Sequence, residues 1–199
     1  MAILKIAQLG HPVLRRIGDP VTREEIASER IQRLIDDMIE TMREHSGVGI
    51  AAPQVHLSRQ IAVLESSEKA RYPARSEFPL TVVVNPVIVE RSNEMVYDWE
   101  GCLSIEGLRG RVPRNARVVV EALDRNGKTQ RLELDAFPAV VAQHEIDHLQ
   151  GVLFIDRMED LRTLAFNREY SRYWLGDDED EDEGEGEGEA EGPEAAEGR

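Results

Sequence analysis

The hydrophobic and polar positions of residues 22–45 alternate at helical spacing. In the second half of this segment, isoleucine, leucine and methionine recur every three or four positions, which predicts a helix face packed against a core. Thr22 and Glu25 have the spacing of a capping box, and Ser28 offers a second cap. We therefore expect either one helix or a short turn that leads into a long one.

The middle of the chain has the pattern of strands. Residues 61–65 and 80–90 are rich in β-branched side chains, and the polar stretch 66–79 between them is expected to be a loop. Residues 117–136 predict a hairpin that turns at the Asn-Gly pair 126–127, because this pair favours a tight turn between two strands.

Helical spacing returns in residues 137–151, where Gly151 is placed to end the helix, and an amphipathic segment covers residues 160–174. Helices and strands do not alternate strictly along the chain. The pattern therefore predicts an α+β fold, with mostly antiparallel sheets packed around the central helix at 137–151, an N-terminal helix and a C-terminal helix.

The charge of the chain is concentrated at its C-terminus. The formal net charge is −15, and residues 177–199 hold 13 acidic residues and one arginine, which leaves a net charge of −3 for residues 1–176. The acidic segment has almost no apolar residues, so we expect a catalytic domain at 1–176 followed by a disordered tail at 177–199. The domain has no basic stripe, which argues against direct nucleic-acid binding.

Other features of the composition bear on location. The chain shows no apolar run long enough to span a membrane and no signal segment. Its one cysteine, Cys102, fits a reducing compartment. We therefore expect a cytoplasmic protein that does not bind membranes.

The helix at 137–151 carries a metal-binding pattern. His144 and His148 are four residues apart, hence on one helix face, and Glu145 lies beside the first. The alternative is that one histidine is a satisfied core residue and the other is exposed. The apolar neighbours indicate a buried helix, in which two unpaired imidazoles are unfavourable, and this favours a metal site with Glu145 as acid and base.

A catalytic site of this kind needs a third protein ligand and one open position. Downstream of the helix the candidates are Asp156, Glu159 and Asp160, and upstream lies Cys102 in the segment EGCLS. A thiolate with two imidazoles makes a three-ligand site with room for water. The alternative for Cys102 is a small buried hydrophobe.

Three segments, taken in order, resemble those of peptide deformylases of the bacterial type: GVGIAAPQ at 47–54, EGCLS at 100–104 and QHEIDH at 143–148. The resemblance runs from about Ile6 to about Arg172. It implies a metal-dependent hydrolase of linear amides that removes the formyl group from the N-terminal formylmethionine of new polypeptides. A metallopeptidase and a non-catalytic metal-binding protein are the alternatives.

The resemblance implies a metal site of three side chains, namely Cys102, His144 and His148. It implies that Glu145 moves protons to and from the reacting water, and that Gln54 and the backbone N–H of Leu103 face the developing oxyanion. The expected cofactor is one divalent ion, Fe²⁺ first, with Zn²⁺, Ni²⁺ or Co²⁺ also compatible with these ligands.

The resemblance also implies a path for the substrate. Gly49 would offer backbone hydrogen bonds to an extended peptide, Val140 and Val141 would line an apolar pocket for the methionine side chain, and Arg109 occupies a position associated with substrate or loop anchoring. The full expected set is Val48, Gly49, Gly101, Arg109, Val140 and Val141. The implied partners are N-formylmethionyl nascent peptides, met near the ribosome.

Overall fold

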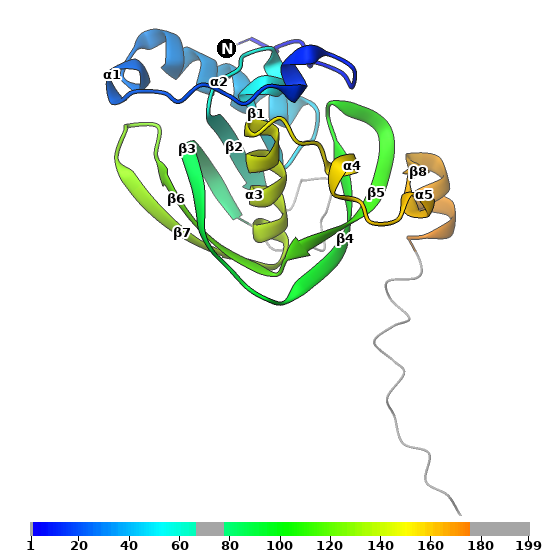
Figure 1. The fold of residues 1–199 in the computed structure, drawn as a ribbon. Helices are drawn as coiled ribbons and strands as arrows, with labels where there is room; N and C mark the ends of the chain where they lie inside the picture. The colour runs from blue at the N-terminus through cyan, green and yellow to red at the C-terminus, as the bar shows by residue number, and fades with distance from the viewer. Residues whose placement is uncertain (1, 67–77, 176–199) are drawn as a thin grey trace, which may run out of the picture.

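The computed structural model describes residues 2–66 and 78–175, and its centre is a five-stranded antiparallel sheet (Figure 1). The strands lie in the order β1 (Gly49–Ala51), β2 (Ile61–Ser66), β3 (Phe78–Arg91), β6 (Arg117–Leu123) and β7 (Thr129–Asp135). The two predicted strands and the predicted hairpin are confirmed. Residues 67–77 of the expected loop, and the expected tail at 177–199, lie outside the described residues.

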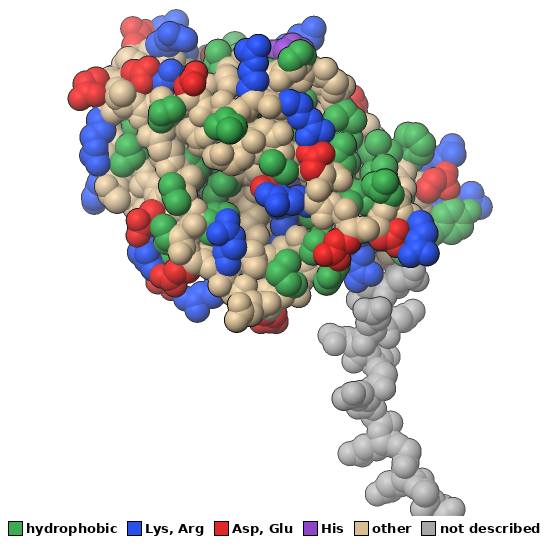
Figure 2. Space-filling model, viewed as in Figure 1, with side chains coloured by type: hydrophobic (Ala, Val, Ile, Leu, Met, Phe, Trp, Pro, Cys, Tyr) green, Lys and Arg blue, Asp and Glu red, His purple; other side chains and the backbone are tan. Residues whose placement is uncertain are grey.

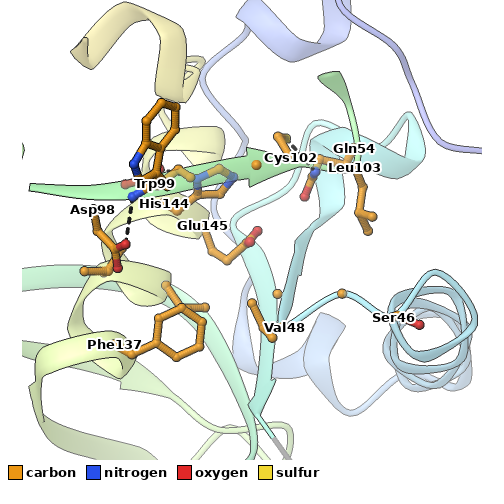
Figure 3. Close-up of a pocket in the computed structure, with 16 residues that line it drawn as sticks. Ser46, Val48, Gln54, Asp98, Trp99, Cys102, Leu103, Phe137, His144 and Glu145 are labelled. Atoms are coloured by element: carbon orange, nitrogen blue, oxygen red, sulfur yellow. Dashed lines mark hydrogen bonds and ion pairs between the residues drawn. The ribbon is translucent and has the colours of Figure 1, made fainter. Parts of the chain in front are cut away.

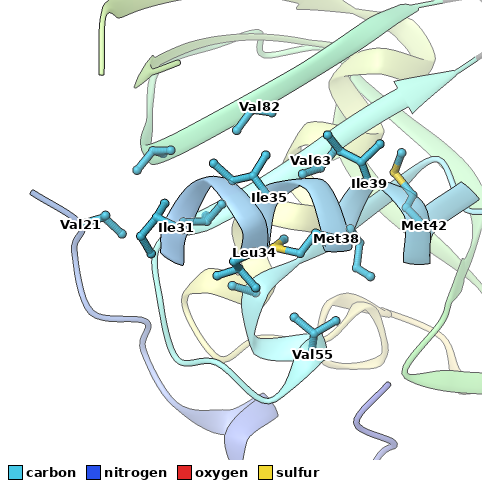
Figure 4. Close-up of a cluster of buried hydrophobic side chains, with 14 of the residues drawn as sticks. Val21, Ile31, Leu34, Ile35, Met38, Ile39, Met42, Val55, Val63 and Val82 are labelled. Carbon is cyan, nitrogen blue, oxygen red and sulfur yellow. The ribbon is translucent and has the colours of Figure 1, made fainter. Parts of the chain in front are cut away.

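The predicted N-terminal helix is present as a short turn that leads into a long helix. The one-turn helix α1 (Arg23–Ile26) precedes α2 (Glu29–Glu44), Thr22 and Glu25 form the expected capping box, and Ser28 caps α2. The apolar face of α2 forms a core with residues of the sheet and its connections (Figure 4): Ile31, Leu34, Ile35, Met38, Ile39 and Met42 pack with Val21, Val55, Val63 and Val82.

The helix α3 (Ala136–Leu149) covers the opposite face of the same sheet. Along β2, Ile61 and Val63 belong to the core under α2, whereas Ala62 and Leu64 belong to a second core that contains α3. Successive strand residues point to opposite faces, so one strand contributes to both cores. The sheet is therefore buried on both sides, and α3 is held in the middle of the molecule.

A second, three-stranded sheet lies beside α3, and the hydrophobic pattern does not predict it. Its order is β4 (Met95–Cys102), β5 (Ile105–Asn115) and β8 (Ala165–Phe166). Glu100 and Arg114 are buried on one of its faces. A strand that buries charged residues lacks the alternation of apolar and polar positions by which strands are predicted.

The C-terminal helix is shorter than the sequence predicts. After α4 (Phe154–Arg157) comes a 3₁₀ turn at Leu161–Thr163, and α5 (Asn167–Tyr173) begins only after β8. The expectation of one helix over 160–174 is therefore wrong in its first half, because Ala165 pairs with Arg109 of β5 instead. Further 3₁₀ turns lie at Pro12–Arg15 and Ala52–Val55. Within the described ranges, no helix has both the length and the apolar composition needed to cross a membrane.

Candidate active site

Three potential metal ligands meet where β4 ends against α3. Cys102 is the last residue of β4, and His144 and His148 lie one turn apart on α3. One ligand atom from each of the three lies within 4.8 Å of the others, and the Cys102 Sγ is 3.2 Å from the His148 Nε2. The structure thus brings together the three residues that the sequence proposes as a metal site.

A buried carboxylate orients the first histidine. The Glu100 Oε2 lies 2.7 Å from the His144 Nδ1, and Arg114 donates from Nε and Nη2 to the same carboxylate at 2.6 and 3.0 Å. Burial by itself would raise the pKa of Glu100, but the hydrogen bonds from His144 and Arg114 outweigh it and hold the pKa at about 2. Glu100 is therefore a carboxylate that fixes the ring of His144 through its Nδ1–H and leaves the Nε2 for an ion.

Arg114 also contacts a second acidic residue, Asp147, which lies on α3. Arg114 donates to the Asp147 Oδ2 at 2.6 Å, and Arg157 of α4 donates to the Asp147 Oδ1 at 2.7 Å. Both contacts are salt bridges, and Asp147 is not a member of the ligand cluster. These ion pairs join α3 to β5 and to α4.

Glu145 is the one acidic side chain of the site that lacks such partners. It is 4 % exposed, and its Oε2 has no hydrogen-bond partner among the described residues. Burial raises the pKa of Glu145 to about 7. A carboxyl group that titrates near neutral pH is suited to accept a proton and to return it.

Gly49 of β1 is in close contact with Glu145. A Cβ atom at this position would lie 2.7 Å from the Glu145 Cδ, closer than real Cβ atoms approach other atoms. Position 49 therefore requires a glycine if the carboxylate is to keep its place.

The amide of Gln54 is oriented by hydrogen bonds at both ends. Its Oε1 accepts from the Ala51 N–H at 2.8 Å, and its Nε2 lies 3.3 Å from the Ser104 Oγ and 3.5 Å from the Cys102 Sγ. The amide therefore presents its N–H₂ side to the ligand cluster. The carbonyl of Leu103 accepts from the Gln8 Nε2 at 3.1 Å, which ties the loop after Cys102 to the N-terminal segment.

A pocket opens beside this cluster (Figure 3). In Figure 3, Val48 and Phe137 lie on one side of Glu145, and Gln54 and Leu103 lie on the other. The expected substrate-binding residues in its lining are Val48, Gly49, Gly101, Val140 and Val141, together with the site residues Gln54, Cys102, Leu103, His144 and Glu145.

Arg109 is placed differently from the other expected residues. It is not among the residues that line this pocket, and it is 5 % exposed. Its guanidinium lies over the ring of Tyr170, 5.1 Å from the centroid.

The sequence pattern does not identify several residues at or beside the site, among them Trp99, Glu100, Arg114 and Phe137. Glu100 lies inside the segment EGCLS, and its charge two positions before the expected ligand Cys102 is the available signal. Its partners are 14 and 44 positions away in sequence, so no local pattern identifies them.

The donor set fits a divalent cation. A thiolate and two imidazoles suit ions of intermediate softness such as Fe²⁺, Co²⁺, Ni²⁺ and Zn²⁺. Burial lowers the pKa of His148 well below its usual range, which favours the neutral ring that can donate a lone pair to an ion. Three protein donors with an adjacent carboxyl group make the arrangement found in hydrolases that use one metal ion.

Comparison with known proteins agrees with this geometry. The family model described as "Polypeptide deformylase" matches residues 3–163. A protein named peptide deformylase 2 of a Nostoc species is 46% identical over 168 residues, which cover 84% of this chain and 93% of that protein. A protein of the same name from Pseudomonas putida is 42% identical over 82% of this chain and 92% of the relative.

A solved structure is similar in both fold and sequence. The Met-Ala-Ser-bound crystal structure of a class I type b peptide deformylase from Acinetobacter baumannii superposes with a TM-score of 0.77 at 41% identity, covering 79% of this chain and 99% of that one. The chain therefore belongs to the polypeptide deformylase family. Members of this family are enzymes that remove the N-formyl group from nascent peptides.

Proposed function

We propose that this chain removes the formyl group of N-terminal formylmethionine through the site formed by β4 and α3. The observation that carries the proposal is the juxtaposition of three ligand atoms within 4.8 Å of one another with a buried carboxyl group that lacks a partner among the described residues. Hydrolysis of a formamide consumes one water, breaks the C–N bond, and releases formate and a free amine.

The metal would be held by Cys102, His144 and His148, and we propose Fe²⁺ as the native ion, as the resemblance to the deformylase family implies. Zn²⁺, Ni²⁺ and Co²⁺ are compatible with the same donors. When bound, the ion supplies Lewis-acid chemistry, which lowers the pKa of water and stabilises negative charge on oxygen. Glu100 and Arg114 keep His144 in its orientation, and this supports a fixed ligand geometry.

Glu145 is the proposed acid and base. Its carboxylate takes a proton from the attacking water, and the resulting carboxylic acid returns that proton to the departing amine nitrogen. A pKa of about 7 supports both steps, because neither protonation state is strongly disfavoured at neutral pH.

Two donors would stabilise the charge that develops on the formyl oxygen. The Gln54 Nε2 already faces the ligand cluster, and the backbone N–H of Leu103 follows directly after Cys102. Fixed donors of this kind need no reorientation during the reaction, and loss of one typically lowers the rate about 10²–10³-fold.

The peptide substrate would bind as an additional strand. β1 is the edge strand of the five-stranded sheet and contains Gly49, so an extended peptide can pair with its backbone. Val140 and Val141, with Phe137, offer an apolar surface for the methionine side chain. Arg109 does not line the pocket, so it would affect substrate binding indirectly, through the sheet that carries Gly101. The resemblance further supports action on nascent chains close to the ribosome in the cytoplasm.

The experiment that tests this proposal is formate release from formyl-Met-Ala-Ser by protein purified anaerobically, with its metal content measured. The unformylated peptide serves as the control for peptidase activity. We expect formate release that stops when a chelator is added and returns when Fe²⁺ is restored. The variant His148→Ala should lose both metal and turnover, whereas His45→Ala, at an exposed histidine outside the ligand set, should lose neither.

Two results would contradict the proposal. Cleavage of the unformylated peptide would identify a metallopeptidase. One-to-one metal binding without formate release would identify a non-catalytic metal protein.

A further inference from the structure

The strand β4 presents two different faces to the rest of the molecule. On one face, Glu100 contacts His144 and so reaches the ligand cluster. On the other face, the ring of Trp99 packs against the C-terminal segment. Adjacent strand residues point to opposite sides, so a change on one side of β4 is passed directly to the other.

Trp99 is the centre of an aromatic cluster that joins β4 to α5. Its ring centroid is 4.8 Å from that of Tyr170 and 5.2 Å from that of Trp174, at tilted angles of 52° and 55°. Trp99 is only 6% exposed. Tilted rings at this spacing are a favourable packing geometry, which holds the strand and the helix in a fixed relation.

Two further contacts fix α5 against the sheet. β8 pairs with β5 immediately before α5 begins, with Phe166 opposite Leu108. The guanidinium of Arg109 stacks on Tyr170, and the Arg109 Cγ would lie 3.6 Å from a Cβ at Gly101. These contacts therefore support β4 at Trp99 and Gly101, in the stretch that ends at Cys102.

The stretch of β4 that this cluster supports is also a wall of the pocket. Residues 98–103, which comprise the end of β4 and Leu103, all line it in an unbroken run, and Val140 and Val141 of α3 belong to the same lining. In Figure 3 the Trp99 ring points away from Val48 and Phe137, and it packs with Tyr170 and Trp174 instead. The width of the pocket thus depends on how firmly β4 is held from behind.

We infer that Tyr170 and Trp174 are positioning residues for the binding pocket, acting through Trp99 on the β4 wall. The inference rests on the proposed function, because it assigns the methionine side chain to this pocket. It gives the C-terminal helix a role in substrate selection, although none of its residues is part of the ligand cluster or the pocket lining.

The solvent-facing side of β8 and α5 carries exposed side chains that do not belong to the aromatic cluster. Leu161, Phe166, Tyr173 and Leu175 are exposed there, and hydrophobic side chains are visible around β8 and α5 (Figure 2). Tyr173 is 58% exposed and stacks with Arg172 of its own helix. It is therefore an aromatic residue on α5 that matches Tyr170 in type but lies outside the cluster.

The test compares the double variant Tyr170→Ala/Trp174→Ala with the matched control Tyr173→Ala. In the metal-loaded full chain, we expect the double variant to raise KM for formyl-Met-Ala-Ser about tenfold, with a much smaller change in kcat, because a displaced wall weakens binding. Its preference for formyl-Met over formyl-Ala peptides should fall. The conservative variants Tyr170→Phe and Trp174→Phe should restore both KM and preference, and Tyr173→Ala should behave as the unaltered chain.

A second measurement does not depend on turnover. Amide hydrogen exchange in β4 should become faster in the double variant and stay slow in Tyr173→Ala, with exchange in β2 unchanged in both. If the unaltered chain released no formate, the proposed function would fail, and this exchange experiment would still test the coupling. Unchanged β4 exchange, or an equal rise in KM for Tyr173→Ala, would overturn the inference.

The chain offers an optical probe of the same cluster. Its only two tryptophans are Trp99 and Trp174, and both belong to it. In Trp174→Phe, fluorescence reports Trp99 alone, so addition of the product peptide Met-Ala-Ser should shift the emission if the pocket wall and the ring move together. An emission spectrum that stays constant at saturating peptide would count against the coupling.

Discussion

The two long helices of this protein are buried for different reasons. In α2, the buried residues are almost all apolar and lie on one face, and the opposite face carries charge. In α3, every residue from Pro138 to Leu149 is buried, and five of them are polar or charged: Gln143, His144, Glu145, Asp147 and His148. Burial on α2 provides a core, whereas burial on α3 provides a second core and also encloses polar and charged groups.

The difference is visible in how each buried polar group is satisfied. A polar group removed from water destabilises the fold unless it finds a partner. Gln143 bonds to the backbone of Asn115, His144 to Glu100, and Asp147 to Arg114 and Arg157. The exceptions on α3 are the Oε2 of Glu145, which has no partner among the described residues, and the Nδ1 of His148, whose Nε2 contacts Cys102. An unpaired buried acid destabilises the fold, and this favours a functional reason for its position.

The largest effect on turnover should come from removing the carboxyl group of Glu145. Glu145→Ala is expected to lower turnover about 10²–10⁴-fold, because the proton acceptor and donor is lost. Metal content should stay near one ion per chain, because Glu145 is not in the ligand set. Formate assays together with metal analysis check both points. A fully active variant would refute the role of Glu145.

A substitution on α2 should have a smaller effect, and it should lower stability while leaving catalysis unchanged. Ile35 is fully buried, so Ile35→Ala should reduce the free energy of unfolding by about 2–5 kcal/mol, whereas Ile35→Val should reduce it by about 0.5–1.5 kcal/mol. Urea denaturation measures the loss, and kcat of the folded variants should be unchanged. A fall in kcat without a loss of stability would break the distinction between the two helices.

The smallest effect concerns neither helix. All residues placed here in the ligand cluster, the pocket and the aromatic cluster lie before position 175. A chain that ends at Gly176 should therefore keep its kcat on short formylated peptides, measured by the same formate assay. A large fall in kcat would show that the acidic segment takes part in catalysis.

The extent to which the sequence predicts this structure depends on what each element packs against. α2, α3, the strands β2 and β3 and the hairpin β6–β7 all pack against apolar neighbours, so their periodicity is legible in the sequence. β4 and β5 bury charge against charge, as Glu100 and Arg114 show, and no apolar alternation marks them. The C-terminal segment is amphipathic, yet pairing of Phe166 with β5 prevails over continued helix.

The candidate site divides in the same way. The spacing of His144 and His148 is a local property of a helix, and it identifies the metal pattern directly. The choice of Cys102 over downstream acids needed the resemblance, because its distance from the helix is set by the second sheet. Glu100 orients His144, and Trp99 packs against Tyr170. Both contacts join residues far apart in sequence, so they are seen only in the folded chain.

Cys102 is the only cysteine of the chain, and its sulfur is one of the three candidate ligands. If Cys102 holds the ion as proposed, one functional group would carry both the thiol chemistry and part of the metal binding of the protein. A thiol titration of a preparation counts vacant, undamaged sites, with no background from other sulfhydryls. Oxidation of that single sulfur would remove a ligand, so exposure to air and loss of the ion would each give an inactive form, and a thiol titration would distinguish the two.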